Sequence, residues 1–268
     1  SVAALLVAAV STTQADDEHY KGWVRSFEEA KTLAAKEGKS ILMEFTGSDW
    51  CPPCKALHKN VLSTEVFNAE IKKDFILLVL DNPRDKSLVT DAEQKQYTKL
   101  SSQYSVTGVP TVFLADAEGK PYHKQVGYGG DPADKWVADA RGKVKVLAQR
   151  DEYFTQASEA QGVERAQLLE KAISGIDQGL ALTLYGDTVD EIISLDKDNA
   201  AGLKDKYAKL RKDAQAEAKQ QELFNESRKL FVAGDKEGAK KMLLEAQKLA
   251  PNTRIGKQIP QIIQANFK

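Results

Sequence analysis

Apolar residues follow two alternating patterns in the first half of the chain. Apolar stretches at 40–46 and 75–81 have the length of strands, and the second is a continuous run typical of a strand buried on both faces. Within 106–114, a further strand is predicted to start at Pro110. Between them, apolar positions in 16–39, 55–62, 64–71 and 91–104 recur every three or four residues, which predicts helices. A turn at 117–120 leads to a strand near 122–126, and Pro132 opens a last helix. We predict a mixed sheet flanked by helices, with its first two strands parallel and its last two antiparallel.

The pattern changes near residue 150, where strand signals end and Ala, Lys, Glu, Gln and Leu dominate. Helices are predicted near 150–175, 179–195, 198–232 and 235–250, with a final one after Pro260. The segment 233–252 has the spacing of a tetratricopeptide-type helical hairpin, and 193–199 ends a helix in a comparable way. A plain antiparallel bundle explains the same pattern. We therefore expect a mixed domain over 16–150 and an all-α, helical-hairpin domain over 151–268.

The N-terminus carries the pattern of an exported protein. Residues 2–10 are apolar and too few to span a membrane, and Thr13 and Ala15 place small residues where a signal peptide is cleaved. We interpret 1–15 as the remainder of a signal peptide and expect a periplasmic or other extracytoplasmic location. The alternative is a buried core helix or a poorly ordered tail. The net charge of −1 disfavours a nucleic-acid binder.

Both cysteines of the chain lie in one motif, Cys51-Pro52-Pro53-Cys54, between the strand at 40–46 and the helix at 55–62. A helix N-terminus favours negative charge, and the thiolate is the reactive form of cysteine in disulfide exchange. We expect Cys51, at the helix start, to be the more exposed, attacking thiol. Cys54, one turn deeper, is expected to resolve the mixed disulfide.

The two prolines bear on the direction of the reaction. Pro52 and Pro53 fit a first helical turn, but they remove two N–H groups that would otherwise help to hold a Cys51 thiolate. A less stabilised dithiolate makes a more reducing couple. The spacer therefore favours a reductase over a strong oxidase.

The motif fits a zinc site or covalent haem attachment less well than it fits a redox-active cysteine pair. A Cys-x-x-Cys pair is half of a zinc site, and His58 lies four residues past Cys54, but no second cysteine pair exists. Covalent haem attachment requires His where Lys55 stands. We predict no metal and no cofactor beyond a redox-active Cys51–Cys54 disulfide.

Two positions outside the motif complete the candidate site. Glu44 stands in the apolar strand behind the cysteines, where a buried carboxyl would have a raised pKa and could relay the proton of Cys54. The alternative is a Glu that faces water. Pro110 begins a strand, and a cis bond from Val109 would leave backbone groups beside the cysteines for an extended substrate. The alternative is an ordinary trans proline.

Trp50-Cys51-Pro52-Pro53-Cys54-Lys55 after an apolar strand, with Gly108-Val109-Pro110-Thr111 further on, resembles the thioredoxin family over residues 20–148. The string 45–51 is similar to exported bacterial thioredoxin-like proteins. The resemblance implies a thioredoxin fold, Cys51 as nucleophile, Cys54 as resolving thiol, Pro110 as a cis-proline and Trp50 as the aromatic flank. Thioredoxin itself carries Gly-Pro between its cysteines and Asp as its buried acid, where this chain has Pro-Pro and Glu44.

The leading functional hypothesis is an exported thiol–disulfide oxidoreductase that reduces disulfides of envelope proteins. Cys51, Cys54 and Glu44 are the candidate catalytic residues, and the candidate substrate-binding residues are Trp50, Pro52, Pro53, Val109 and Pro110. Its partners would be disulfide-containing proteins and an electron-donor protein. The alternatives are a disulfide isomerase or oxidase with the same cysteines, and an adaptor whose helical domain recruits partners.

Overall fold

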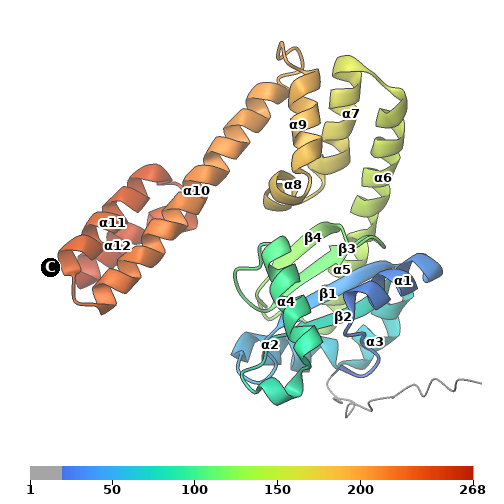
Figure 1. Cartoon of the computed structure of the whole chain (residues 1–268), viewed down its shortest axis with the longest axis horizontal. Coiled ribbons are helices and arrows are strands. Elements are labelled where there is room, and N and C mark those ends of the chain that lie inside the picture. Colours follow the sequence, from blue (N-terminus) through green and yellow to red (C-terminus); the bar gives the residue numbers. More distant parts are fainter. Residues whose placement is uncertain (1–19, 268) are drawn as a thin grey trace, which may run out of the picture. The chain divides into compact units, whose positions relative to one another are not determined.

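The computed structural model describes residues 20–267, so the predicted signal peptide at 1–15 lies outside the described residues. The chain divides into two compact units between Gln149 and Arg150 (Figure 1). The first unit contains all four strands found in the described residues, and the second is helical. The predicted class, a mixed sheet flanked by helices and followed by helices alone, is confirmed.

The sheet has the strand order β2-β1-β3-β4. Its strands are β1 (Ser40–Thr46), β2 (Phe75–Asp81), β3 (Thr111–Ala115) and β4 (Pro121–Val126). Strand β1 pairs in parallel with β2 and antiparallel with β3, so that Glu44 lies opposite Val79 on one side and Val112 on the other. Strands β3 and β4 form the antiparallel hairpin that the sequence predicts. All seven residues of β1 are buried, which places the strand that leads to the cysteines in the middle of the sheet.

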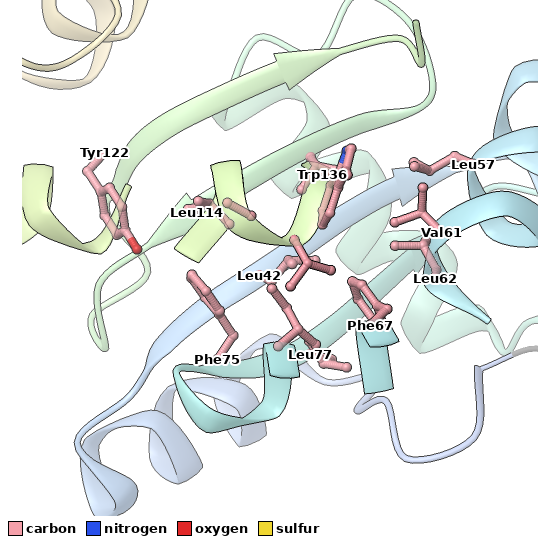
Figure 2. Packing of buried hydrophobic residues seen from close by; sticks show 14 residues of the cluster. Leu42, Leu57, Val61, Leu62, Phe67, Phe75, Leu77, Leu114, Tyr122 and Trp136 are labelled. Atoms are coloured by element: carbon pink, nitrogen blue, oxygen red, sulfur yellow. The ribbon is translucent and has the colours of Figure 1, made fainter. Parts of the chain in front are cut away.

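Helices of the first unit cover both faces of the sheet. The elements are α1 (Phe27–Glu37), α2 (Pro52–Leu57), the π-helical turn η2 (His58–Leu62), α3 (Glu65–Glu70), the short turns η3 (Ile71–Lys73) and η4 (Lys86–Leu88), α4 (Asp91–Gln103) and α5 (Ala133–Gly142). One face packs with α2, η2, α3 and α5 around a single apolar cluster (Figure 2). Its members include Leu42, Leu57, Val61, Phe67, Leu77, Val112, Leu114 and Trp136. The other face carries the aromatic rings of Phe45, Phe113, Tyr97 and Tyr104, in contact with one another.

The alternation along β1 decides which side chains reach the cysteine helix. Successive residues of a strand point to opposite faces, so Glu44 and Thr46 share the face of Leu42. That face is the one covered by α2, because Leu42 and Leu57 belong to the same cluster. The acid of the strand therefore points toward the layer that holds Cys54.

Within 16–39, the predicted helix follows a polar start and includes Trp23 and Val24, so it is predicted to begin too early. Helix α1 begins only at Phe27, capped by Ser26, and ends at Gly38 in the left-handed conformation. Val24, which the pattern placed on the helix, instead bridges Leu78 of β2, with two backbone hydrogen bonds of 2.8 and 3.1 Å. A β-branched residue beside an open sheet edge satisfies its backbone groups there and not in a helix.

The second unit begins within α6 (Val144–Glu159), which crosses the boundary between the units. It continues with α7 (Gly162–Ser174), α8 (Gln178–Leu184), α9 (Gly186–Leu195), α10 (Leu203–Val232), α11 (Lys236–Leu249) and α12 (Arg254–Asn266). Buried Gln220 of α10 donates to the carbonyl oxygens of Ala246 and Ala250, which fixes α10 against the end of α11. A small apolar cluster of Leu243, Ala246 and Ile259 joins α11 to α12.

Two helix boundaries in this unit differ from the prediction. The single helix expected near 150–175 is broken into α6 and α7, where Gly162 adopts a left-handed conformation with φ of 55° that a continuous helix cannot include. The last helix starts at Arg254, not after Pro260, and Pro260 lies inside it. Its start is fixed by Thr253, whose hydroxyl accepts the N–H of Gly256.

Two glycines give a test of the packing of the first unit. Gly38 and Gly119 both have positive φ, but an added Cβ meets nothing at Gly38 and lies 2.2 Å from Cζ of buried Phe27 at Gly119. Gly38→Ala should lower the free energy of unfolding by about 1 kcal/mol through backbone strain alone. Gly119→Ala should lower it by about 2–4 kcal/mol, because strain and overpacking add. Chemical denaturation of the two variants measures the difference, and equal losses would show that the Phe27 contact carries no cost.

Candidate active site

Helix α2 begins at Cys51. Cys51 is the N-cap residue in extended conformation, and Pro52 and Pro53 occupy the first two helical positions, as predicted. Prolines have no N–H, so Cys54 provides the first backbone donor of the helix. That N–H donates to Cys51 Sγ across 3.3 Å. One backbone donor is therefore directed at one sulfur.

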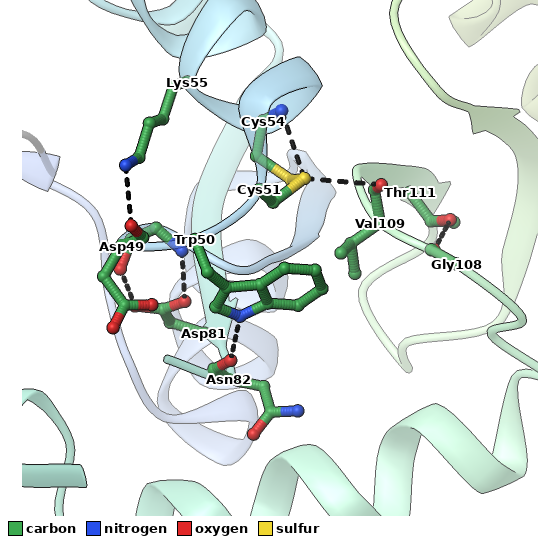
Figure 3. The surroundings of a disulfide bond; sticks show 11 residues. Asp49, Trp50, Cys51, Cys54, Lys55, Asp81, Asn82, Gly108, Val109 and Thr111 are labelled. Carbon is green, nitrogen blue, oxygen red and sulfur yellow. Dashed lines mark hydrogen bonds between the residues drawn. A yellow bond between two sulfur atoms is a disulfide. The ribbon is translucent and has the colours of Figure 1, made fainter. Parts of the chain in front are cut away.

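The two cysteines are joined in a disulfide with a Cα–Cα distance of 5.2 Å. Each is only 2% exposed. The expectation that Cys51 is the more exposed thiol is wrong for this disulfide form, because Cys51 lies behind the chain at Val109 and beside the half-buried Trp50 (Figure 3). What distinguishes the two sulfurs is the donor at the helix start, and not their accessibility.

The loop at Pro110 faces Cys51. The Val109–Pro110 peptide bond is cis. The carbonyl oxygen of Val109 lies 3.5 Å from Cys51 Sγ, and Pro110 is buried behind Val109, which is half-buried. The loop is held by two further bonds, from Gly127 N–H to the Pro110 carbonyl and from the Thr111 hydroxyl to the Gly108 carbonyl. Val109 therefore presents its main chain to the disulfide from a fixed position.

The loop before Cys51 is tied to the end of β2. Ser48 donates its N–H and its hydroxyl to the carboxylate of Asp81 at 3.0 and 2.5 Å. The indole N–H of Trp50 donates to the carbonyl of Asn82 at 2.9 Å (Figure 3). Gly47 permits this packing, since an added Cβ would lie 2.5 Å from the Trp50 ring. The strand pairing thus fixes both the aromatic flank and the start of α2.

Asp49 holds the next loop. Its carboxylate accepts the N–H groups of Arg84 and Asp85 at 2.9 to 3.0 Å. The N–H of Asp85, with that of Arg84, lowers the pKa of the Asp49 carboxyl. The guanidinium of Arg84 lies 5.5 Å above the ring of Trp50, and Lys55 Nζ donates to the Asp49 carbonyl. Exposed Pro52 and Pro53 complete this rim.

Glu44 is fully buried, so the alternative of a water-facing Glu is wrong. Burial raises the pKa of its carboxyl to about 8, and the nearby Asp81 adds to the rise. The hydroxyls of Tyr20 and Thr46 offset part of this effect. Neither hydroxyl forms a hydrogen bond to Glu44 by distance and angle. The two carboxylate oxygens of Glu44 have no other hydrogen-bond partner among residues 20–267. The group can therefore exchange a proton near neutral pH.

Comparisons with known proteins find matches to the first unit of the chain. A family model for the thioredoxin-like domain matches residues 27–139. Residues 27–139 are a thioredoxin-like domain. The predicted resemblance is confirmed by this match.

Two relatives from Chlamydia pneumoniae match parts of the thioredoxin-like domain. Disulfide bond reductase DsbH is 33% identical over 95 residues, which are 35% of this chain and 57% of that protein. Thioredoxin-related protein DsbJ is 23% identical over 109 residues, 41% of this chain and 31% of that protein. The match thus spans a little over half of the first relative and about a third of the second.

Solved structures also match this part of the chain. One named DsbH oxidoreductase covers 46% of this chain and 83% of its own, at 26% identity and a TM-score of 0.43. A disulphide isomerase from Xylella fastidiosa covers 44% and 87%, at 23% identity and a TM-score of 0.32.

Several residues around the thioredoxin-like domain's cysteines were not foreseen. Asp81 carries a signal in the sequence, because the carboxyl ends of two parallel strands meet at one edge of a sheet and β1 ends just before the motif. Asn82, the next residue, lies at the same edge of the sheet. Tyr20 and Thr46 had no such signal. No group of three or more metal-binding side chains occurs in the part of the chain that the structure describes, nor does a helix long and apolar enough to cross a membrane.

The raised pKa of Glu44 has a measurable effect on stability. The unfolded carboxyl ionises near its ordinary value of 4.5, whereas the folded one keeps its proton to about pH 8. The stabilisation is complete below pH 4.5 and is lost as pH rises toward 8, by up to about 5 kcal/mol for the oxidised protein. Glu44→Gln should flatten this decline, as measured by denaturant titrations between pH 5 and 9.

The exposed Glu118 of the β3–β4 turn provides the matched control. Glu118→Gln should leave the decline unchanged. If Glu44→Gln and the native protein lose stability in parallel over this range, the buried carboxyl does not carry the proton that the structure assigns to it.

Proposed function

We propose that this protein is a thiol–disulfide oxidoreductase that reduces disulfides in other exported proteins. The observation that carries the proposal is the N–H of Cys54 directed at Cys51 Sγ at the start of α2. A donor at this place favours the thiolate of Cys51 over that of Cys54. The match to a disulfide bond reductase over part of its length supports the same reaction.

The reaction begins with the reduced dithiol. The Cys51 thiolate attacks one sulfur of the substrate disulfide, that bond breaks, and the first substrate thiolate leaves and takes a proton from water. Cys54 then gives its proton to a base, for which we propose Glu44, and attacks Cys51 Sγ. The second substrate thiolate leaves as the Cys51–Cys54 bond of the structure forms. Two electrons have passed from the enzyme dithiol to the substrate, and a dithiol donor protein must restore them.

Substrate binding is proposed for the surfaces that flank Cys51. The main chain of Val109, fixed by the bonds of Pro110 and Gly108, is placed to pair with an extended segment of substrate. Trp50 and the exposed rings of Pro52 and Pro53 offer apolar contact on the opposite side.

The direction of the reaction follows from the prolines. A strong oxidant stabilises its reduced, thiolate form, and several donors at the helix start do this. Here Pro52 and Pro53 leave the N–H of Cys54 as the first donor of the helix, and it is directed at the sulfur. The couple is therefore more reducing, which supports reduction over oxidation or isomerisation.

We propose the cellular location and the role of the helical domain from the sequence and from the exposed side chains of its helices. We propose export from the apolar run at 2–10 and the small residues Thr13 and Ala15. The domain proposed for 151–268 contains no cysteine, so its part in the reaction is limited to binding or support. Exposed Phe231, Val232 and Leu244 on α10 and α11 favour a role in recruiting partners.

Redox equilibrium with glutathione tests the direction. We expect a potential more negative than about −200 mV, together with reduction of insulin disulfides in the presence of a dithiol donor. Pro53→Ala restores the N–H at the second helical position, which reaches an N-cap side chain, and should raise the potential by about 30 mV or more.

Pro52→Ala is the matched control, because the N–H at the first helical position does not reach the cap. It should shift the potential by less than Pro53→Ala does. A native potential near about −120 mV, the value of strongly oxidising proteins of this fold, would replace the reductase with an oxidase.

A further inference from the structure

The loop that follows β2 places a cation against the aromatic flank of the cysteine pair. The guanidinium carbon of Arg84 lies 5.5 Å from the ring centroid of Trp50, the residue before Cys51. Figure 3 shows this ring extending from Asn82 toward Val109, along the side of the disulfide. A charge held over the ring is therefore close to the sulfur that a substrate disulfide approaches.

The main chain of Arg84 is held beside this ring at two points. The Asp49 carboxylate accepts the N–H groups of Arg84 and Asp85 at 2.9 to 3.0 Å. Two residues before Arg84, the carbonyl of Asn82 accepts the indole N–H of Trp50 at 2.9 Å. Because loop and ring are joined in this way, the Arg84 side chain loses less conformational entropy on stacking than a side chain on a free loop would.

The guanidinium donors of Arg84 are not used within the described chain. The residue is exposed, and among residues 20–267 its side chain forms neither a hydrogen bond nor an ion pair. A guanidinium carries five N–H donors in a planar fork that matches the two oxygens of a carboxylate. Contact with the Trp50 ring uses none of these donors. They are therefore free to bind a carboxylate from another molecule.

The neighbouring charged groups are bound by neutral partners of the protein. Lys55 Nζ donates to the Asp49 carbonyl, and Lys86 Nζ donates to three neutral oxygens of the loop and of α4. The carboxylates of Asp49 and Asp85 accept N–H and hydroxyl donors of the same loop, so their oxygens are directed into it. These carboxylates weaken the long-range attraction of an anion to Arg84. Recognition by Arg84 must therefore come from direct hydrogen bonds.

We propose that Arg84 is a specificity-determining residue that binds the carboxylate of an acidic side chain next to the disulfide attacked by Cys51. The preferred substrates are then protein disulfides with Asp or Glu beside the attacked cysteine. An extended segment that pairs with the main chain of Val109 places a neighbouring side chain over Trp50, where the guanidinium lies. The inference rests on the proposed function and adds to it a preference among substrates.

Matched peptides measure this preference. Each peptide carries a single cysteine joined by a disulfide to a neutral pyridinethiol, with either Glu or Gln on both sides of the cysteine. The Cys51 thiolate attacks the peptide sulfur, the pyridinethiolate leaves and takes a proton from water, and its absorbance gives the second-order rate constant of the reduced protein. The same rates with β-mercaptoethanol correct for the intrinsic reactivity of each peptide. We expect the Glu peptide to react about five times faster than the Gln peptide.

Arg84→Gln keeps the backbone N–H that Asp49 accepts and should lower this rate ratio to about one. Arg84→Lys keeps the charge without the fork and should leave a ratio of about two. The matched control is Lys36→Gln, which removes an exposed cation of α1 and should keep the native ratio.

A ratio that survives Arg84→Gln, or an equal slowing of both peptides in that variant, would overturn the role of Arg84. Equal rates for the two peptides in the native protein would do the same, and the proposed reduction would stand because both peptides are reduced. If the native protein reduces neither peptide, the proposed function fails, and the preference fails with it.

Discussion

One backbone hydrogen bond, from the N–H of Cys54 to the sulfur of Cys51, makes the two chemically identical side chains unequal. It exists because α2 starts at Cys51 and because Pro52 and Pro53 leave no earlier donor. Both sulfurs are equally hidden from solvent in the disulfide, so accessibility cannot assign their roles. The proposed nucleophile, the proposed direction of electron flow and the position of substrate beside Val109 all depend on this helix start.

The sheet fixes where that helix start lies. Parallel pairing of β1 with β2 brings Asp81 next to Ser48, and the two bonds between them anchor the loop that leads into Cys51. Pairing of β1 with β2 and β3 places Glu44 between Val79 and Val112, and desolvation raises the pKa of its carboxyl. One register of strands thus determines both the geometry at Cys51 and the proton affinity behind Cys54.

Much of this arrangement follows from local patterns. The continuous run at 75–81 and the strand at 40–46 are apolar enough to predict buried strands, and the prolines predict the first turn of α2. The exposure of Cys51 could not be predicted, since it depends on how the chain at Val109 and Trp50 covers the disulfide. Val24 was wrongly placed in a helix because its bridge to Leu78 is a tertiary contact. The last helix was predicted to start after Pro260, but the cap at Thr253 starts α12 earlier and Pro260 lies inside it. Tyr20 lies far from the motif in sequence, and only folding brings it to the pocket that Thr46 and Cys54 also line.

The thiolate absorbance of single-cysteine variants tests the inequality of the two sulfurs most directly. In reduced Cys54→Ala the N–H at position 54 is retained, so the Cys51 thiol should ionise below the ordinary value of about 8.5. In Cys51→Ala the Cys54 thiol is buried and lacks that donor, so it should ionise above about 8.5. A Cys54 thiol that ionises at lower pH than Cys51 would contradict the assignment of Cys51 as the nucleophile.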